Sequence, residues 1–230
     1  MEWRTWRGVG FPCRAPTKSG KEIEIRVSHM TLAHVRWWHS HIQPVIDEDP
    51  TRVDTGWNWL LYVPFATLAG GVLAREPHGY TIGIAARAVG RLIPCALIQL
   101  LGRYTALDDH QKKSAFVWFM STAPDKALLE IKEYRLTEDQ LPKRLGTIAL
   151  DVALTHSLNH RRLGRVALHA DVEGGDALLE WYQRRGMEVL SAEQRLPPGP
   201  RRLLKPSDGR YCFYTLEGAL VESRALDPLR

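Results

Sequence analysis

The stretch GRVALHADVEGGDALLEWYQRRGMEVL, residues 164–190, decides the fold. Residues 166–170 are apolar and have the length and composition of a buried strand. Residues 176–185 then have the spacing of an amphipathic helix, and Gly186 stands where a glycine commonly ends a helix. Residues 187–190 are typical of a second short strand. Two strands joined by one helix predict an α/β protein with a crossover connection.

A helix and three strands are predicted upstream of this stretch. Residues 147–162 carry a broad apolar face at helical spacing, and Gly164 stands where this helix should end. Residues 80–85 and 96–104 are typical of strands. Residues 114–120 (SAFVWFM) are apolar and aromatic, which predicts a strand at the centre of the sheet. Because tight turns join antiparallel strands and a helix joins parallel ones, the sheet should be mixed.

The N-terminal part is predicted to form one strand and two helices. Residues 21–27 (KEIEIRV) alternate charged and apolar side chains, as a half-buried strand does. Ser28 is expected to cap a helix that ends at Gln43, because Pro44 should stop it. A second helix is expected to begin after residues 54–55.

Tyr182, Gly186 and Met187 form a Y-x-x-x-G-M pattern at the end of the second predicted helix. In this position the pattern resembles the Y-x-x-x-G-F segment of the GNAT N-acetyltransferase superfamily. The resemblance covers residues 80–216, which end in a strand predicted at 210–216. It implies an α/β fold with a GNAT-like mixed, partly splayed β-sheet flanked by helices. The expected single domain has an N-terminal strand and variable helix pair (1–79), a core sheet with cofactor-binding helices (80–216) and a C-terminal tail (217–230).

The resemblance implies that the protein binds acetyl-CoA or another acyl-CoA. The superfamily holds the cofactor in a Q/R-x-x-G-x-G/A loop, which residues 143–148 match best. Gly146 keeps one glycine-like position, whereas Ile148 stands at the other, and residues 125–145 make a longer connection than is usual. The implied cofactor contacts are Met120, Ser121 and Thr122 at the end of the central strand and Lys143, Arg144, Gly146 and Thr147 at the next helix.

The start of that helix also has the chemistry of a phosphate site. Free backbone N–H groups and the helix dipole both favour an anion there. Gly146 and Thr147 open the predicted helix, and Lys143 and Arg144 add positive charge. The alternative is an ordinary capped helix start with charged residues around it.

Acetyl transfer to an amine needs a base for the amine proton, donors for the oxyanion and an acid for the thiolate. By resemblance Tyr182 is the candidate acid; the alternative is a core tyrosine. His169, Asp171 and Glu173 alternate, so they share one face of an extended backbone. Glu173 and His169 are the preferred candidate bases, because the pKa of either is readily tuned. The alternative is ordinary polarity at a strand edge.

Other residues offer weaker signals of function. His156 and His160 have the i, i+4 spacing of metal ligands on a helix, but no third ligand is evident. We therefore interpret them as surface histidines and expect no metal site. Tryptophans at 37, 38, 57 and 59 are expected to pack in the core or, alternatively, to line an acceptor pocket.

The charge of the protein does not identify its binding partner. The net charge of +5 and a pI near 9.2 favour an anionic partner, although the basic residues are scattered. The densest group is Arg195, Arg201, Arg202 and Lys205, which predicts a solvated loop or a phosphate or nucleic-acid contact. Nucleic acid remains an alternative partner that no motif supports.

Composition favours a cytoplasmic protein. The sequence has no apolar run long enough for a membrane span and no apolar segment typical of a secretory signal. Its three cysteines, Cys13, Cys95 and Cys212, lie far apart, which fits free thiols in a reducing compartment.

Two functions follow from these observations. The first is an acyl-CoA-dependent N-acyltransferase acting by direct attack within a ternary complex. Its amine acceptor could be a small amine, a peptide or protein amine, or an aminoacyl group on RNA. The second is a GNAT-shaped binding or regulatory protein that has lost catalysis, which Ile148 and the long connection favour. The oligomeric state is open, with a homodimer as one alternative.

Overall fold

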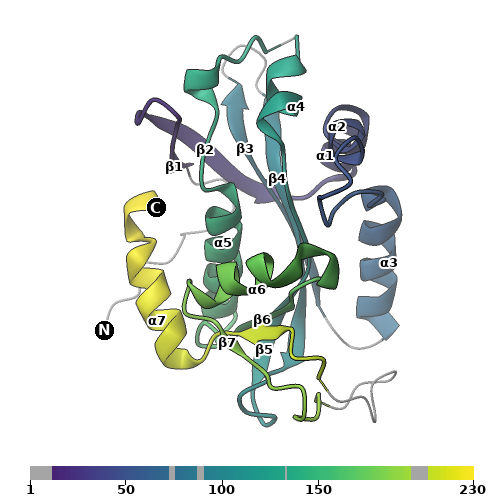
Figure 1. Cartoon of the computed structure of the whole chain (residues 1–230), viewed down its shortest axis with the longest axis vertical. Helices are drawn as coiled ribbons and strands as arrows, with labels where there is room; N and C mark the ends of the chain where they lie inside the picture. Colours follow the sequence, from purple (N-terminus) through teal and green to yellow (C-terminus); the bar gives the residue numbers. More distant parts are fainter. Residues whose placement is uncertain (1–11, 73–75, 87–90, 133, 198–206) are drawn as a thin grey trace.

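The computed structural model of the protein describes residues 12–72, 76–86, 91–132, 134–197 and 207–230. Within them, eight strands form one sheet in the order β1-β2-β3-β4-β5-β6-β8-β7 (Figure 1). The strands are β1 (Pro12–Pro16), β2 (Glu22–His29), β3 (Pro77–Ala86), β4 (Arg91–Thr105), β5 (Lys113–Thr122), β6 (Val166–His169), β7 (Glu188–Val189) and β8 (Tyr211–Phe213). Neighbouring strands are antiparallel except β5 and β6, which are parallel, so the predicted mixed sheet is confirmed.

Helices cover both faces of this sheet (Figure 1). They are α1 (Leu32–His41), α2 (Gln43–Asp47), α3 (Trp59–Val72), α4 (Asp125–Glu130), α5 (Leu145–Asn159), α6 (Gly175–Gln183) and α7 (Leu216–Ala225), with 3-10 turns η1 (Glu138–Gln140), η2 (Val172–Gly174) and η3 (Asp227–Leu229). α1 and α3 pack against β4 from one side, and α5 packs against β4 and β5 from the other. Every residue of β4 from Ile93 to Gly102 is therefore buried.

The parallel strands β5 and β6 part after a short pairing. Three residue pairs join them, the last between Val117 and Leu168. At Trp118 the register of β5 against β4 shifts by one residue, which makes a bulge. A bulge bends its strand, and β5 continues to Thr122 whereas β6 ends at His169. The predicted splayed sheet is confirmed, and it leaves one edge of β5 without a partner strand.

The N-terminal helices begin later than predicted. β2 continues to His29, so Thr31 caps α1, and its hydroxyl accepts a bond from the backbone N–H three residues on (3.2 Å). Pro44 does not end a helix but lies in the first turn of α2, where its missing N–H costs nothing. The next helix begins at Trp59.

The C-terminal tail expected from the sequence is largely helical. Residues 217–230 form most of α7 and η3, and α7 packs against α5. The guanidinium of Arg230 pairs with the carboxylate of Asp151 on α5, and the two side chains are only 9% and 1% exposed. Gly164, with φ of +76°, allows this packing, because a Cβ there would lie 2.7 Å from that of Ala219.

The three cysteines are buried free thiols, as predicted. Burial raises the pKa of each thiol, to about 12 for Cys95 and Cys212 and further for Cys13. Among the described residues, none of the helices combines the length and apolar character required to cross a membrane.

Candidate active site

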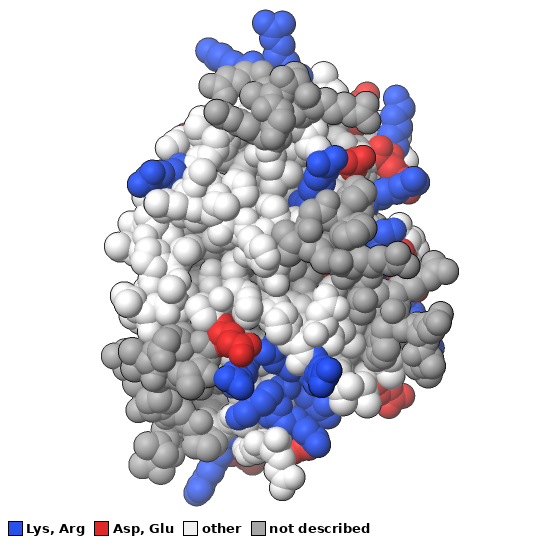
Figure 2. Space-filling view, turned by 180° about the vertical axis from the view of Figure 1, so that it is seen from behind, with Lys and Arg blue, Asp and Glu red and all other residues white. Residues whose placement is uncertain are grey.

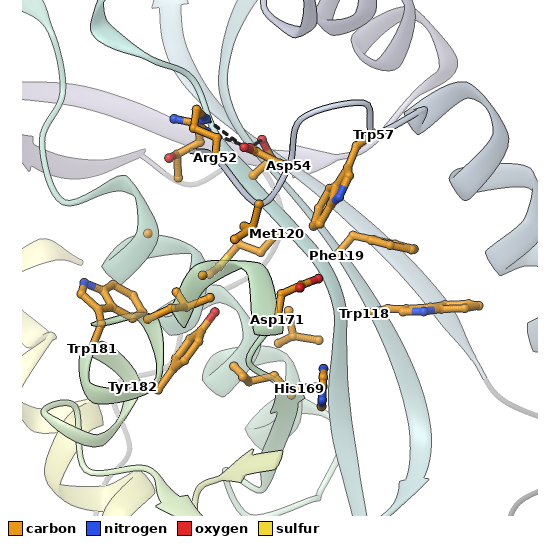
Figure 3. A pocket seen from close by; sticks show the side chains of 18 of the residues that line it. Arg52, Asp54, Trp57, Trp118, Phe119, Met120, His169, Asp171, Trp181 and Tyr182 are labelled. Carbon is orange, nitrogen blue, oxygen red and sulfur yellow. Dashed lines mark hydrogen bonds and ion pairs between the residues drawn. The ribbon is translucent and has the colours of Figure 1, made fainter. Parts of the chain in front are cut away.

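A cavity of about 1090 Å³ opens where β5 and β6 part (Figure 3). β5 forms one wall with residues 116–122, and the end of β6 and the turn after it form the floor. α6 closes a third side, and residues 51–54 with Trp57, between α2 and α3, cover the remaining side. The bulge in β5 therefore creates the space, and the surrounding elements line it.

The free edge of β5 faces this cavity. The N–H of Ala123 bonds to the carbonyl of Cys95 on β4 (2.8 Å). Backbone groups alternate along a strand, so those of Met120 and Thr122 point to the opposite edge. The carbonyl of Thr122 accepts a bond from Nη2 of Arg52 (2.8 Å), which leaves the backbone groups of Met120 facing the cavity.

A partly buried ion pair closes one end of the cavity (Figure 3). Nε and Nη2 of Arg52 donate to the two carboxylate oxygens of Asp54, at 2.8 and 2.7 Å. The hydroxyl of Ser121 also donates to Asp54, at 2.5 Å. These contacts hold the covering segment against β5 through the Asp54 carboxylate.

A second, smaller cavity of about 280 Å³ lies at the N-terminus of α5. Lys143, Arg144, Gly146 and Thr147, the loop residues chosen from the sequence, all line it. No side chain caps the helix here, so its first N–H groups lack a capping acceptor. Ile148 takes the second glycine-like position of the loop pattern, which suggested that its side chain fills the cofactor space. It is instead fully buried in the core and does not line the cavity.

Arg185 of the turn after α6 is a residue of this small cavity that sequence reasoning missed. Its guanidinium carbon lies 3.6 Å from the ring centroid of Trp181, and its Nη2 donates to the hydroxyl of Thr147 (3.0 Å). Its Nε is buried and makes no hydrogen bond with the described residues. Lys143, in contrast, is paired at 2.5 Å with Asp125, which also lines the cavity. Arg185 is thus one cation of this cavity with an unpartnered donor, beside the exposed Arg144.

Tyr182 lies on α6 against the larger cavity (Figure 3). Its side chain is buried, and its hydroxyl makes no hydrogen bond with any described residue. Burial, and to a lesser degree the nearby Cys212, raises the pKa of Tyr182. The hydroxyl therefore keeps its proton at neutral pH.

His169, at the end of β6, forms a dyad with Asp208. Its Nε2 lies 2.7 Å from Oδ2 of Asp208, and both residues line the cavity. Because a carboxylate oxygen accepts, Nε2 carries the proton in the neutral ring and Nδ1 carries the lone pair. Burial acts to raise the pKa of Asp208, but the bonds from His169 and the main chain outweigh it and hold this pKa below its ordinary value.

Glu173 does not join His169 at the cavity, contrary to the prediction from alternation. β6 ends at His169 and the chain turns into η2, so the extended spacing is lost. Asp171 lines the cavity, but one of its oxygens accepts the backbone N–H of Glu173 (3.0 Å). The Glu173 side chain is exposed and lies outside the cavity lining.

Aromatic rings form the cavity wall nearest α3 (Figure 3). Trp57, Trp118 and Phe119 all line the space, and Phe119 is stacked on Trp118 with centroids 5.4 Å apart. Trp38 and Trp59 are fully buried instead. Trp38 and Trp59 therefore pack in the core as expected, and Trp57 lines the cavity.

Two further sequence interpretations can be compared with the structure. His156 is only 3% exposed, so the interpretation as a surface histidine is wrong for it.

Figure 2 shows the basic side chains of one face in several separate groups rather than in one patch. Residues 201–205 of the predicted basic group lie outside the described residues.

Comparison with solved structures agrees with this architecture, although no protein-family model and no curated protein matches the sequence. Apo FdhC, described as a nucleotide-linked sugar GNAT, is 11% identical with a TM-score of 0.50, covering 96% of this chain and 99% of that one. An acetyltransferase of the GNAT family from Staphylococcus aureus is 11% identical with a TM-score of 0.49, over 84% and 99% of the two chains. Spermidine N-acetyltransferase from Vibrio cholerae, in complex with CoA and spermine, is 13% identical with a TM-score of 0.48, over 85% and 98%.

The similarity to FdhC extends over nearly the whole of both chains. The chain therefore has the GNAT fold. A fold shared at this identity does not establish activity, which has to be argued from the site itself.

Proposed function

We propose that this protein is an acyl-CoA-dependent N-acyltransferase, with acetyl as the first candidate acyl group. The observation that carries the proposal is the pair of cavities, one at the open edge of β5 and one at the uncapped start of α5. Both are lined by Thr122, Gly146 and Trp181, so they adjoin. An extended cofactor with a phosphorylated end fits such an arrangement.

The residues at the small cavity suit a pyrophosphate. The uncapped N–H groups at the start of α5 and the helix dipole favour an anion. The unpartnered Nε of Arg185 offers a further charged donor. A Cβ at Gly146 would make an ordinary contact with the ring of Trp181 at 3.4 Å, so the glycine leaves the space beside this ring free. Gly146, Thr147 and Arg185 would hold the phosphates, and the free edge at Met120 would hold the pantetheine arm.

His169 and Tyr182 have complementary roles in the proposed reaction. Acyl-CoA supplies an acyl group already activated as a thioester. His169 accepts, at Nδ1, the proton that the amine loses as its nitrogen bonds to the acyl carbon. Tyr182 donates its hydroxyl proton to the sulfur as the carbon–sulfur bond breaks, and both groups then recover their protonation states through solvent. Asp208 holds the imidazole in the tautomer that this step requires.

One observation favours a second function, a binding or regulatory protein without catalysis. The carboxylate of Asp125 lies in the small cavity and is paired with Lys143, which puts an anion where the phosphates would bind. This ion pair neutralises Lys143, the lysine that the loop contributes to the cavity.

Melting of the protein with and without acetyl-CoA tests the proposal. A ligand at 100 times its Kd stabilises the native state by about 2.7 kcal/mol, which is a shift of several degrees. Absence of a shift at millimolar acetyl-CoA would contradict acyl-CoA binding altogether.

Release of free CoA thiol separates the two functions once binding is seen. Small amines, peptide N-termini and aminoacyl esters serve as acceptors, and heat-treated protein is the control. Thiol release that depends on an amine supports the transferase. Binding without release from any class supports the binding protein.

A further inference from the structure

Three histidines meet at the end of α5 far from the proposed active site. His78 comes from β3, and His156 and His160 follow each other by one helical turn. One ring nitrogen of each lies within 4.8 Å of those of the other two. His160 is 14 positions beyond Gly146, which is roughly 20 Å along the helix axis. The cluster is therefore separate from the acyl-CoA cavities.

The hydrogen bonds of the two helical histidines fix their tautomers. Nδ1 of His160 lies 2.8 Å from the main-chain oxygen of His156, and because that oxygen only accepts, Nδ1 carries the proton. Arg162 Nη1 lies 3.1 Å from Nε2 of His156 and can only donate, so this Nε2 carries a lone pair. The Nδ1 proton of His156 then bonds to the hydroxyl of Tyr80 (2.9 Å). Both rings thus offer Nε2 as a ligand atom, held by a bond at Nδ1, as in metal-binding histidines.

His78 supplies the third ring and brings a carboxylate with it. Its Nε2 is buried and makes no hydrogen bond with the described residues. Oε2 of Glu76 lies 3.9 Å from this nitrogen and 3.0 Å from Nη2 of Arg162. The guanidinium of Arg162 therefore donates both to Nε2 of His156 and to the carboxylate of Glu76. It supplies the positive charge of the cluster.

We propose that His78, His156 and His160 bind a divalent transition-metal ion of the Zn²⁺ type, with Glu76 as the fourth ligand. Three imidazoles and one carboxylate are a donor set that Zn²⁺ and Co²⁺ take in tetrahedral geometry. The ion replaces the guanidinium of Arg162 as the cation between His156 and Glu76, so Arg162 competes with it. His160 is exposed, which gives the ion a path from solvent.

The three rings come from distant parts of the chain. His78 lies on β3, whereas His156 and His160 lie on and just after α5. A bound ion would join β3 to the end of α5.

Co²⁺ binding to tag-free, chelator-treated protein tests the site, because four-coordinate Co²⁺ absorbs strongly in the visible. We expect one equivalent to bind with this absorption, and Zn²⁺ to displace it. His78→Ala and His160→Ala should each weaken binding by at least about tenfold. His41→Ala is the matched control, since it removes an exposed histidine from another helix. Circular dichroism confirms that each variant is folded.

The Arg162→Gln variant should change the affinity for Co²⁺ in the opposite direction. Without the competing guanidinium, Co²⁺ should bind more tightly than to the wild type. No tetrahedral Co²⁺ signal at 1:1 stoichiometry, or wild-type affinity in both His78→Ala and His160→Ala, would overturn the site. Unchanged or weaker binding to Arg162→Gln would overturn the role of Arg162. None of these readouts depends on acyl transfer.

Discussion

Nε2 of His169 and Oδ2 of Asp208 lie 2.7 Å apart although the two residues are 39 positions apart in the chain. β6 carries the histidine, and the turn that leads into β8 carries the carboxylate. β6 and β8 pair with His169 opposite Tyr211, which brings that turn to the end of β6. The sheet itself therefore assembles the dyad.

Asp208→Asn should lower kcat of acyl transfer by at least about tenfold, because an amide can also donate to Nε2 and so no longer fixes the tautomer of His169. The KM for acyl-CoA should stay near the wild-type value, since Asp208 lies outside the small cavity. Steady-state kinetics measure both, with the exposed Asp139→Asn as control. If Asp208→Asn lowers kcat equally in a His169→Gln background, the two residues do not act as a unit.

Tyr182→Phe should slow transfer and leave the protein as stable as before. The hydroxyl makes no hydrogen bond with described residues, so its removal breaks none. Single-turnover kinetics and a melting curve measure the two effects, and Tyr62→Phe is a control outside the cavity lining. An unchanged rate would remove Tyr182 from the mechanism.

Arg185→Gln should weaken acyl-CoA binding by about tenfold, or about 1.4 kcal/mol, because it removes a charged, unpartnered donor from the small cavity. Its neighbour Arg184 provides the matched control, since its side chain is 64% exposed and outside this cavity. Calorimetric titration gives both Kd values. Equal effects of Arg184→Gln and Arg185→Gln would point to a general loss of charge rather than a contact.

The free energy of unfolding should fall as the pH drops below about 6.5, the ordinary pKa of histidine. The pKa of His156 is lowered in the folded state to about 2, chiefly by burial, so the unfolded chain binds one more proton between these two values. The slope should approach about 1.4 kcal/mol per pH unit. The ionisable groups that face His156 are His78, His160, Arg162 and Tyr80.

Urea titrations at a series of pH values measure this slope. His156→Gln should flatten it between pH 6.5 and the acid range, since it removes the group that titrates. A slope that is unchanged in His156→Gln would assign the acid sensitivity to other residues.

Asp151→Asn should lower the free energy of unfolding by about 3–5 kcal/mol, because it removes the buried counter-charge of the Arg230 guanidinium. Asp227 also pairs with Arg230, but its side chain is 39% exposed, so Asp227→Asn should cost much less. Chemical denaturation compares the two variants. Similar costs would show that the C-terminal turn is held by other contacts.

Local hydrophobic periodicity was enough to predict the fold. The site was predicted less completely, because several of its residues are brought together only by pairing between distant segments. Residues 164–190 carry their helix and strands in their own periodicity, so their elements appear where expected. Alternation placed Glu173 with His169, but it presumed an extended chain that stops at the end of β6. The sequence did not indicate that Asp208 lies beside His169 or that His78 lies beside His156. These residues are far apart in the chain, and the pairing of strands brings them together.

The buried thiols make the protein convenient for spectroscopy. Cys13, Cys95 and Cys212 are enclosed and protonated at neutral pH, so thiol-reactive dyes should leave the native protein unlabelled. A cysteine introduced at an exposed position, such as Val221 on α7, would then be the sole reactive site. Pairs of such labels on α3 and α6 could follow, in solution, whether the two sides of the cleft approach each other when a substrate enters.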